Sequence, residues 1–208
     1  MHVYSDEDGI FLVKLARSTV DSFVTSKEKP DVPEDTPEHL KRDSGVFVTL
    51  NSMVRDHVSL RGCIGRPYPR QPLVEAVIDS AVDAAVNDPR FRRVSKEELD
   101  SILVELSVLT PPEKLDYSNP NDLLRMIEIG RDGLIVSRGM FRGLLLPQVP
   151  VEWKWNVKEF LEHTCNKAGL PLNAWKDLDT EFMAFQAEIF GEEVPRGNVI
   201  RNPSHPRC

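Results

Sequence analysis

The segment from Ile102 to Leu109 constrains the fold more than any other part of this chain. Its residues are apolar on both faces of an extended chain, except at Glu105 and Ser107. A strand of this kind belongs in the middle of a covered sheet, because either of its faces would otherwise expose apolar side chains to water. The pattern therefore predicts a central strand and a fold built around a sheet with other layers packed on it.

Three amphipathic helices are predicted to form those layers. Ser5 and Asp8 have the spacing of a capping box, and Gln71-Pro72 opens a second helix because proline is tolerated at the first helical position. Asn156 caps a third helix that runs to Ala168, and Gly169 is expected to end it in the left-handed conformation. The apolar stripes of the first two helices are Leu12, Leu15, Ala16, Val20, Phe23 and Val24, and Leu73, Val74, Val77, Ile78, Ala81, Val82 and Ala85.

Further strand-like segments surround the central one. They are Gly45 to Asn51, Val58 to Ile64, Gly133 to Val136, Gly143 to Leu146 and Glu181 to Phe190. Hairpins and short links join the neighbours, which is typical of an antiparallel sheet with helices packed on it. The predicted fold class is therefore α+β, with a mainly antiparallel sheet and flanking helices. The tail after Pro195 has no periodicity and is predicted to be irregular.

Charge argues against one class of partner. The 208 residues carry a formal net charge of -7, whereas nucleic-acid binding needs Lys and Arg to displace counterions from phosphates. Several arginines close together in sequence still allow a local basic patch, although a solvated face is the simpler interpretation. These arginines are Arg61, Arg66, Arg70, Arg90, Arg92 and Arg93.

A cytoplasmic protein without a membrane span is expected. No apolar run approaches the length of a span, and the first eight residues are acidic where a secretory signal would be basic and then apolar. Cys63, Cys165 and Cys208 have the spacing of neither a disulfide framework nor a zinc site, and their odd number is typical of a reducing compartment. No metal site is predicted.

The most informative polar segment is Arg61-Gly62-Cys63-Ile64-Gly65. Side chains alternate along a strand, so Arg61 and Cys63 are predicted to share a polar face while Gly62 faces the core. A nearby guanidinium favours thiolate over thiol, and the glycines free backbone amides to converge on an anion. The alternative is a buried structural cysteine at a bulge or a tight packing contact.

The ordered motifs of the chain resemble those of the AMMECR-type protein family. Leu60-Arg61-Gly62-Cys63-Ile64-Gly65 is similar to the family's hallmark segment. The later segments that resemble it are Asp88-Pro89-Arg90-Phe91, Gly133-Leu134-Ile135, Leu146-Pro147-Gln148-Val149, Phe160-Leu161 with His163 and Cys165, and Lys167-Ala168-Gly169-Leu170-Pro171. The resemblance runs in the expected order from the first helix to about Phe190.

The resemblance implies an α+β protein with a larger and a smaller lobe and the Cys63 motif at their junction. It implies a single domain over residues 1–194, with part of 53–90 in the smaller lobe, followed by an irregular tail over 195–208. Related microbial genes are associated with a Memo-like protein and a radical-SAM enzyme, which are therefore the implied partners. No reaction is firmly assigned to the family, so the resemblance implies neither a cofactor nor an activity.

Three further side chains are candidates for ligand contacts. Gln148 is expected to end the preceding strand, provided that Pro147 does not turn the chain, and its amide there either orients a ligand or satisfies the strand-end backbone. His163 lies about 200° around its helix from Cys165, which favours a surface or cleft position for the histidine and a core position for the cysteine. Glu75, on the polar side of the helix that follows the cysteine motif, is a candidate base.

Two main functional hypotheses follow, and a third, an RNA-associated protein that uses the Arg61 to Arg93 cluster, is disfavoured by the acidic net charge. In the first, the protein is an enzyme or a substrate-handling subunit that acts through Cys63, with Arg61 beside it, on a small molecule or a protein. In the second, it is a non-catalytic module that recognises a protein partner in the same cleft, and a homodimer is compatible with both. The remaining candidate binding residues are Gly62, Gly65, Gln148, His163 and Glu75. Trp153 and Trp155 straddle Lys154, where they form either a stacking platform or part of the core.

Overall fold

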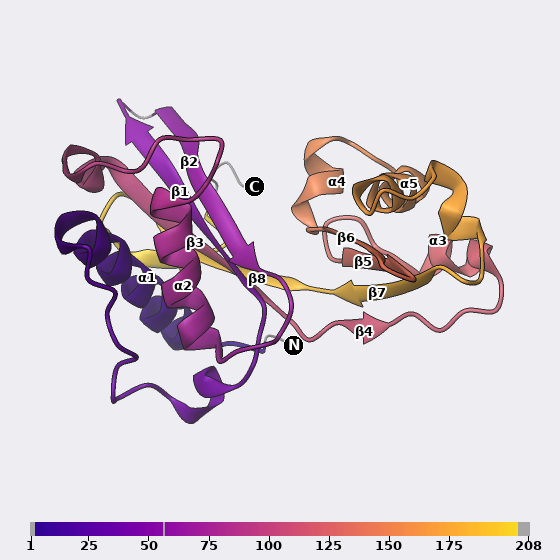
Figure 1. Cartoon of the computed structure of the whole chain (residues 1–208), viewed down its shortest axis with the longest axis horizontal. Helices are drawn as coiled ribbons and strands as arrows, with labels where there is room; N and C mark the ends of the chain where they lie inside the picture. Colours follow the sequence, from indigo (N-terminus) through magenta and orange to yellow (C-terminus); the bar gives the residue numbers. More distant parts are fainter. Residues whose placement is uncertain (1–2, 56, 204–208) are drawn as a thin grey trace. The chain divides into compact units, whose positions relative to one another are not determined.

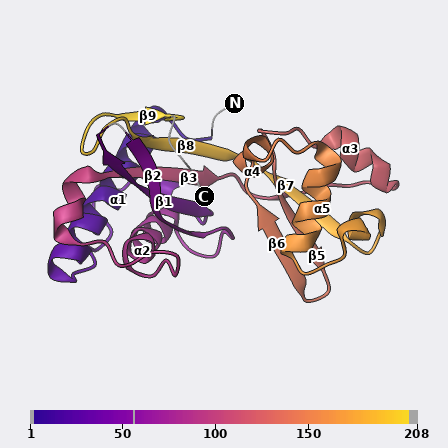
Figure 2. The same ribbon diagram turned by 90° about the horizontal axis from the view of Figure 1, so that it is seen from above.

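The computed structural model describes residues 3–55 and 57–203, and its contacts divide the chain into two compact units. The larger unit runs up to Leu109 and resumes at Glu188, and the smaller unit is Thr110–Ala187 (Figures 1 and 2). Residues 53–90 therefore belong to the larger unit, contrary to the expectation that part of them lies in the smaller lobe. Each unit has its own sheet and its own hydrophobic core.

The larger unit is a sheet of strand order β2-β1-β3-β8-β9, with two long helices on one face (Figure 1). β1 pairs antiparallel with both β2 and β3, and β9 pairs antiparallel with β8. The strands are β1 (Val46–Val54), β2 (His57–Arg66), β3 (Ile102–Leu109), β8 (Ala187–Glu192) and β9 (Val199–Arg201). The helices are α1 (Asp6–Ser26), α2 (Leu73–Val86) and the 3-10 helices η1 (Glu38–Lys41) and η2 (Lys96–Ser101).

β3 confirms the prediction of a central strand, since all its residues are buried. On one face, Val104 and Leu106 join the apolar side chains of α1 and α2 in the core. The other face carries buried polar side chains, namely Thr49, Asn51, Glu105 and Ser107. Pro203 packs over this second face, where a Cβ added to Gly191 would lie 2.9 Å from its Cγ. The polar row is therefore enclosed by protein.

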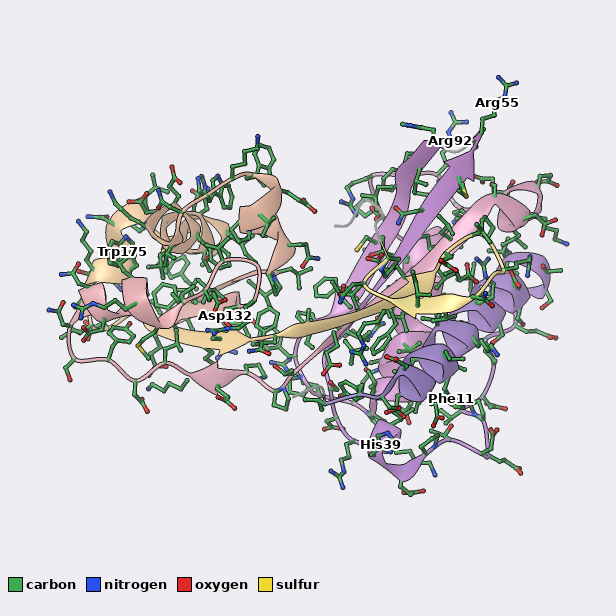
Figure 3. The ribbon with its side chains drawn as sticks, turned by 180° about the vertical axis from the view of Figure 1, so that it is seen from behind. Phe11, His39, Arg55, Arg92, Asp132 and Trp175 are labelled. Atoms are coloured by element: carbon green, nitrogen blue, oxygen red, sulfur yellow. The ribbon has the colours of Figure 1, made fainter. Side chains whose placement is uncertain are left out.

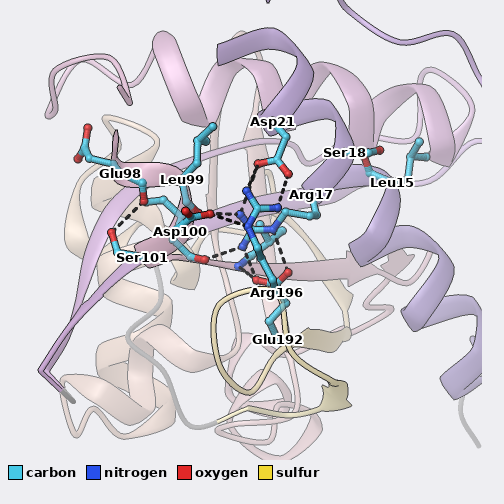
Figure 4. Close-up of polar contacts among 12 residues, drawn as sticks. Leu15, Arg17, Ser18, Asp21, Glu98, Leu99, Asp100, Ser101, Glu192 and Arg196 are labelled. Atoms are coloured by element: carbon cyan, nitrogen blue, oxygen red, sulfur yellow. Dashed lines mark hydrogen bonds and ion pairs between the residues drawn. The ribbon is translucent and has the colours of Figure 1, made fainter. Parts of the chain in front are cut away.

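A buried ion pair ties α1 to the sheet (Figure 4). The Arg17 guanidinium donates to both carboxylate oxygens of Glu192 in β8, and Arg17 Nη2 also donates to the carbonyl of Ile102 at 2.5 Å. Glu192 in turn accepts the backbone N–H of Val104 at 3.0 Å. Arg17 and Glu192 are 8% and 3% exposed, so this network replaces water as the hydrogen-bonding environment of both charges.

The smaller unit is a sheet of strand order β4-β7-β5-β6 that carries α5 on one face. Its pairs are antiparallel. The strands are β4 (Glu113–Lys114), β5 (Gly133–Arg138), β6 (Phe141–Leu145) and β7 (Glu181–Phe185). The helices are α3 (Leu123–Met126), α4 (Gln148–Glu152), α5 (Val157–Lys167) and the 3-10 helices η3 (Pro120–Asp122) and η4 (Leu172–Lys176).

The predicted helix starts and the α+β class are confirmed. The Ser5 and Asn156 side chains accept the backbone N–H of Asp8 and Glu159 in complete capping boxes, and Pro72 is the N-cap of α2. Gly169 follows α5 with φ +77, the left-handed conformation that was expected of it.

The single long strand predicted from Glu181 to Phe190 is wrong, because its two halves lie in different sheets. The segment Glu181 to Phe190 is interrupted at Gln186, where its backbone pairs with Thr110: Thr110 N–H donates to the Gln186 carbonyl at 2.8 Å, and Gln186 N–H donates to Thr110 Oγ1 at 2.8 Å. β7 therefore belongs to the smaller sheet and β8 to the larger one. The tail after Pro195 is also more regular than predicted, because Val199–Arg201 forms β9.

Candidate functional site

Cys63 lies on β2, opposite Thr49 of β1. Its sulfur accepts a hydrogen bond from Thr49 Oγ1 at 3.3 Å, and the side chain is 5% exposed. Cys63 is disulfide-bonded in this structure, a bond that the cysteine spacing does not predict. Thiol chemistry at this position would therefore belong to the reduced protein.

The peptide groups of Cys63 are held by the segment that follows α2. β2 is an edge strand, so one side of its backbone has no neighbouring strand. Asp88 Oδ2 accepts the Cys63 N–H at 2.8 Å, and Arg90 Nη2 donates to the Cys63 carbonyl at 3.2 Å. Asp88 and Arg90 thus supply the acceptor and donor that a further strand would supply. We call this pair of side chains the edge clamp.

The edge clamp is itself an ion pair. Arg90 donates to Asp88 from Nε at 3.0 Å and from Nη2 at 2.8 Å. Hydrogen bonds from this guanidinium and from the backbone N–H of Cys63 lower the pKa of Asp88 to about 2. Asp88 therefore remains a carboxylate, the form that accepts all these hydrogen bonds, down to strongly acidic pH.

The glycines of the motif serve close packing. A Cβ on Gly62 would lie 2.2 Å from the carbonyl oxygen of Ala84 in α2, and a Cβ on Gly65 would lie 2.4 Å from the ring of Phe47. Both distances are too short for any side chain. Gly62 thus faces the helix layer as predicted, and Cys63, the next residue along the strand, faces the opposite side of the sheet.

Arg61 is not the neighbour of Cys63 that strand alternation predicts. The register between β1 and β2 shifts at Leu50 and Asn51, which leaves Arg61 as the extra residue of a β-bulge. Its guanidinium donates to Glu98 from Nε at 2.7 Å and from Nη2 at 3.2 Å, and it also donates to the carbonyls of Arg92 and Arg93. These contacts lower the pKa of Glu98 and fasten η2 to β2.

Three of the six arginines of the predicted cluster, Arg61, Arg66 and Arg90, make contacts with carboxylates. Arg66 donates to Ser80 at 3.0 Å and to Asp83 at 2.9 Å, and Arg90 belongs to the edge clamp. Arg92 is exposed, and Figure 3 shows it projecting outward near Arg55 at the end of the β1–β2 hairpin. Glu98, Asp83 and Asp88 therefore offset half of the positive charges of the cluster.

Glu75 lies in the first turn of α2 and is exposed. α2 covers the face of the sheet opposite to the one that Cys63 faces. In the smaller unit, Cys165 is free and fully buried, and burial raises the pKa of its thiol to about 11. Cys165 is therefore a core residue, as predicted.

Gln148 does not end a strand. Pro147 adopts helical backbone angles, φ -58 and ψ -32, and turns the chain so that Gln148 begins α4. The Gln148 side chain is almost completely buried, and its Oε1 accepts no hydrogen bond within the part of the chain that the structure describes. Gln148 and His163 belong to the smaller unit and Cys63 to the larger one, so a cleft that joins them stays a prediction.

His163 takes part in a stack of three aromatic rings, which we call the aromatic stack. The His163 and Trp155 rings are nearly parallel, at 9°, with centroids 3.9 Å apart. The Trp153 ring continues the stack at 6.1 Å and 21° from Trp155, and it is 68% exposed. The stack therefore leads from a half-buried histidine on α5 to a tryptophan in solvent.

An unusual turn positions the aromatic stack. Lys154 has φ +55, and its N–H donates to Val151 O at 3.2 Å while the Trp155 N–H donates to Pro150 O at 2.8 Å. These are the two hydrogen bonds of a Schellman motif, whose left-handed position is usually glycine, as at Gly169. A side chain in this conformation costs about 1 kcal/mol. Sequence reasoning missed this feature, because no glycine marks the turn.

Within residues 3–55 and 57–203, no helix is long and apolar enough to cross a membrane, and no three metal-ligating side chains come together. The family model of AMMECR1 matches residues 13–190. The chain belongs to the AMMECR1 family.

The relatives described here match nearly the whole length of the chain. A protein of Thermococcus gammatolerans is 54% identical over 98% of this chain and 99% of its own length. Protein MJ0810 of Methanocaldococcus jannaschii is 46% identical over 96% and 98%. The crystal structure of the uncharacterized protein PH0010 from Pyrococcus horikoshii superposes with a TM-score of 0.84 at 52% identity, covering 94% of this chain and 96% of that one.

Proposed function

We propose that this AMMECR1-family protein is a non-catalytic binding module that engages a partner protein through its aromatic stack. The observation that carries the proposal is the exposure of Trp153 at the end of a stack that begins at His163. Tryptophan is enriched among the few residues that contribute most of the free energy of protein association. A large aromatic side chain left in solvent is therefore a candidate contact residue.

The backbone around the stack supports the same proposal. Lys154 keeps a left-handed conformation that glycine would adopt without strain, and strained positions concentrate at functional sites. Directly after the turn, Asn156 and Glu159 close the capping box of α5. Both sides of the Trp153–Trp155 pair are thus fixed by hydrogen bonds. A preorganised surface loses little conformational entropy on binding.

The contacts of the Cys63 motif favour a non-catalytic binding module over an enzyme. A catalytic role would need Arg61 to act on the thiol, yet the guanidinium donates to Glu98 and to two carbonyls. Asp88 and Arg90 hold the adjoining peptide. The hallmark segment then has a structural role, in which it locks an edge strand to the rest of the larger unit.

The experiment measures partner binding by calorimetry with the purified full chain. The two titrants are the Memo-like and radical-SAM proteins that the family resemblance suggests. Both the identity of these partners and the cytoplasmic location of the chain stay predictions. Trp153→Ala should weaken binding at least about tenfold, because contact-residue tryptophans contribute more than about 1.4 kcal/mol. Leu172→Ala removes another exposed apolar side chain of the smaller unit, 51% exposed, and should bind like the wild type. Unchanged binding by Trp153→Ala, or no binding of either titrant, would contradict the proposal.

Thiol chemistry at Cys63, on a small molecule or a protein, is a second candidate. The hydrogen bond from Thr49 favours it, because a donor to sulfur stabilises the thiolate. In the reduced protein, Cys63 should be alkylated before Cys165, whose pKa is raised to about 11 by burial. Mass spectrometry after brief alkylation measures the order. Labelling of Cys165 first would leave Cys63 with a structural role alone.

A further inference from the structure

β6 is an edge strand of the smaller sheet. It is joined to β5 by a two-residue turn, Gly139-Met140, in which Gly139 has φ +60. The residues that flank such a turn exchange their hydrogen bonds, and the pairs alternate from there along the hairpin. The backbone N–H and C=O groups of Phe141, Gly143 and Leu145 therefore form hydrogen bonds with β5. The backbone groups of the intervening Arg142 and Leu144 point away from the sheet.

The outward backbone groups of β6 are open. Among the described residues, no side chain or backbone group beyond β5 forms a hydrogen bond with Arg142 or Leu144. This edge has nothing equivalent to the edge clamp of β2. An unpaired edge is a template for another strand. It also carries exposed apolar side chains at its start, because Met140 is 89% and Phe141 48% exposed.

The faces of β6 differ in what they offer. A Cβ on Gly143 would lie 2.6 Å from the backbone nitrogen of Ala168, so Gly143 faces the end of α5. By alternation Arg142 faces the opposite side, where it lines a hollow of about 390 Å³ with Ser137, Glu181 and Asp179. The hollow opens beside the edge at which a new strand would arrive.

Arg142 is the uncommitted cation of this hollow. Its neighbour Arg138 donates to Asp177 at 2.9 Å, and Glu181 accepts from Lys114 at 2.6 Å. Arg142 is exposed and, within residues 3–55 and 57–203, forms no ion pair. A guanidinium at the middle of an open edge is placed to bind a carboxylate on the next strand.

We propose that β6 binds an extended segment of a partner protein as an added strand, and that this segment carries an aspartate or glutamate opposite Arg142. The outward N–H and C=O groups call for a peptide backbone. A second copy of β6 fits less well, because antiparallel pairing centred on Gly143 sets Arg142 opposite Leu144 and Phe141–Leu145 contains no carboxylate. The inference uses a surface other than the aromatic stack and does not depend on it.

The test is a titration of the isotope-labelled full chain with two synthetic peptides, followed by NMR. The probes are acetyl-Val-Thr-Val-Glu-Val-Thr-Val-amide and the same peptide with lysine in place of glutamate. The glutamate peptide should shift the amides of Arg142 and Leu144 and bind at least about tenfold more tightly than the lysine peptide, as expected of one charge-assisted contact. Arg142→Glu should reverse this preference.

Two variants locate the binding surface. Leu144→Pro removes an outward N–H and should abolish binding, since proline is compatible with an edge strand but not with a strand that gains a neighbour. Trp153→Ala should bind the peptide like the wild type, which separates this test from that of the aromatic stack. The proposal is overturned if no amide of β6 shifts at about 5 mM peptide, a concentration that would detect millimolar affinity. Equal affinity for both peptides also overturns the proposal, and so does a preference that Arg142→Glu does not change. These two outcomes can be measured even if Leu144→Pro does not fold.

Discussion

The two edge strands β2 and β6 use the same packing device but leave their outer edges in different states. In β2, Gly62 lets the backbone of α2 approach, and in β6, Gly143 does the same for the end of α5. The outer N–H and C=O of Cys63 are then bound by Asp88 and Arg90. No such side chains reach the outer groups of Arg142 and Leu144 among the described residues.

This difference indicates where the chain can accept a partner. A closed edge resists pairing with another strand, and proteins close their edges with charged side chains and covering segments. The segment Arg61 to Gly65 lies on the closed edge, where its glycines pack closely and Arg61 and Cys63 are hydrogen-bonded within the unit. The open edge lies in the smaller unit, which also carries the exposed Trp153. Both proposed binding surfaces therefore belong to the smaller unit.

The largest effects are expected from substitutions that disrupt the close packing found at both edge strands. Gly62→Ala places a Cβ 2.2 Å from the carbonyl oxygen of Ala84, and Gly143→Ala places one 2.6 Å from the nitrogen of Ala168. Backbone cannot move aside as a side chain can, so each variant should lose about 3 kcal/mol of the free energy of unfolding. Urea unfolding measures it. Gly139→Ala, which adds a Cβ with nothing within 4 Å, is the control and should lose only about 1 kcal/mol through its left-handed φ.

The second prediction concerns a substitution that removes the carboxylate of the edge clamp. The pKa of Asp88 is lowered from 3.8 to about 2, first by the Arg90 guanidinium, which corresponds to about 2 kcal/mol of stability. Because the folded-state pKa is the lower one, this contribution is present above about pH 4 and is lost as the pH falls towards 2. Asp88→Asn should therefore lose about 2 kcal/mol at pH 7 and flatten the dependence of stability on pH below 4.

Urea unfolding of the wild type and of Asp88→Asn between about pH 2 and pH 7 measures how their stabilities differ. Asp83→Asn, at a half-buried position near the end of α2, is the matched control. An Asp88→Asn curve that runs parallel to the wild-type curve would show that the edge clamp contributes no pH-dependent stability.

Much of the fold follows from local sequence, because local signals decide it. The caps of Ser5 and Asn156 and the C-terminal Gly169 each act within a few residues, and the mostly apolar β3 is typical of a central strand. The division into two sheets was missed, because the segment Glu181 to Phe190 is strand-like throughout. Its interruption at Gln186 depends on pairing with Thr110, which is 76 residues away.

The candidate site was harder to predict than the helices, because its contacts also join residues that are far apart in the sequence. Alternation along β2 is a local rule, and a single extra residue at Arg61 breaks it. The partners of Arg61 and Cys63, which are Glu98 and Asp88, come from other segments, and no spacing in the sequence pairs them. The Asp88-Pro89-Arg90 motif was visible, but its role as an edge clamp depends on β2 being an edge strand. The left-handed Lys154 carries no sequence signal.

The last prediction sharpens the comparison by measuring single backbone amides on the two edges. Amide hydrogens exchange with solvent when they are exposed or when their hydrogen bond opens. The Cys63 N–H is bound by a carboxylate within a packed unit, so it should exchange on the order of 100-fold more slowly than the outward N–H groups of Arg142 and Leu144. Hydrogen–deuterium exchange followed by NMR measures each amide. In Asp88→Asn the Cys63 amide should lose most of this protection while those of Arg142 and Leu144 stay fast. If Arg142 and Leu144 exchanged as slowly as Cys63 in the wild type, β6 would be a closed edge, and the proposal of strand addition would lose its basis.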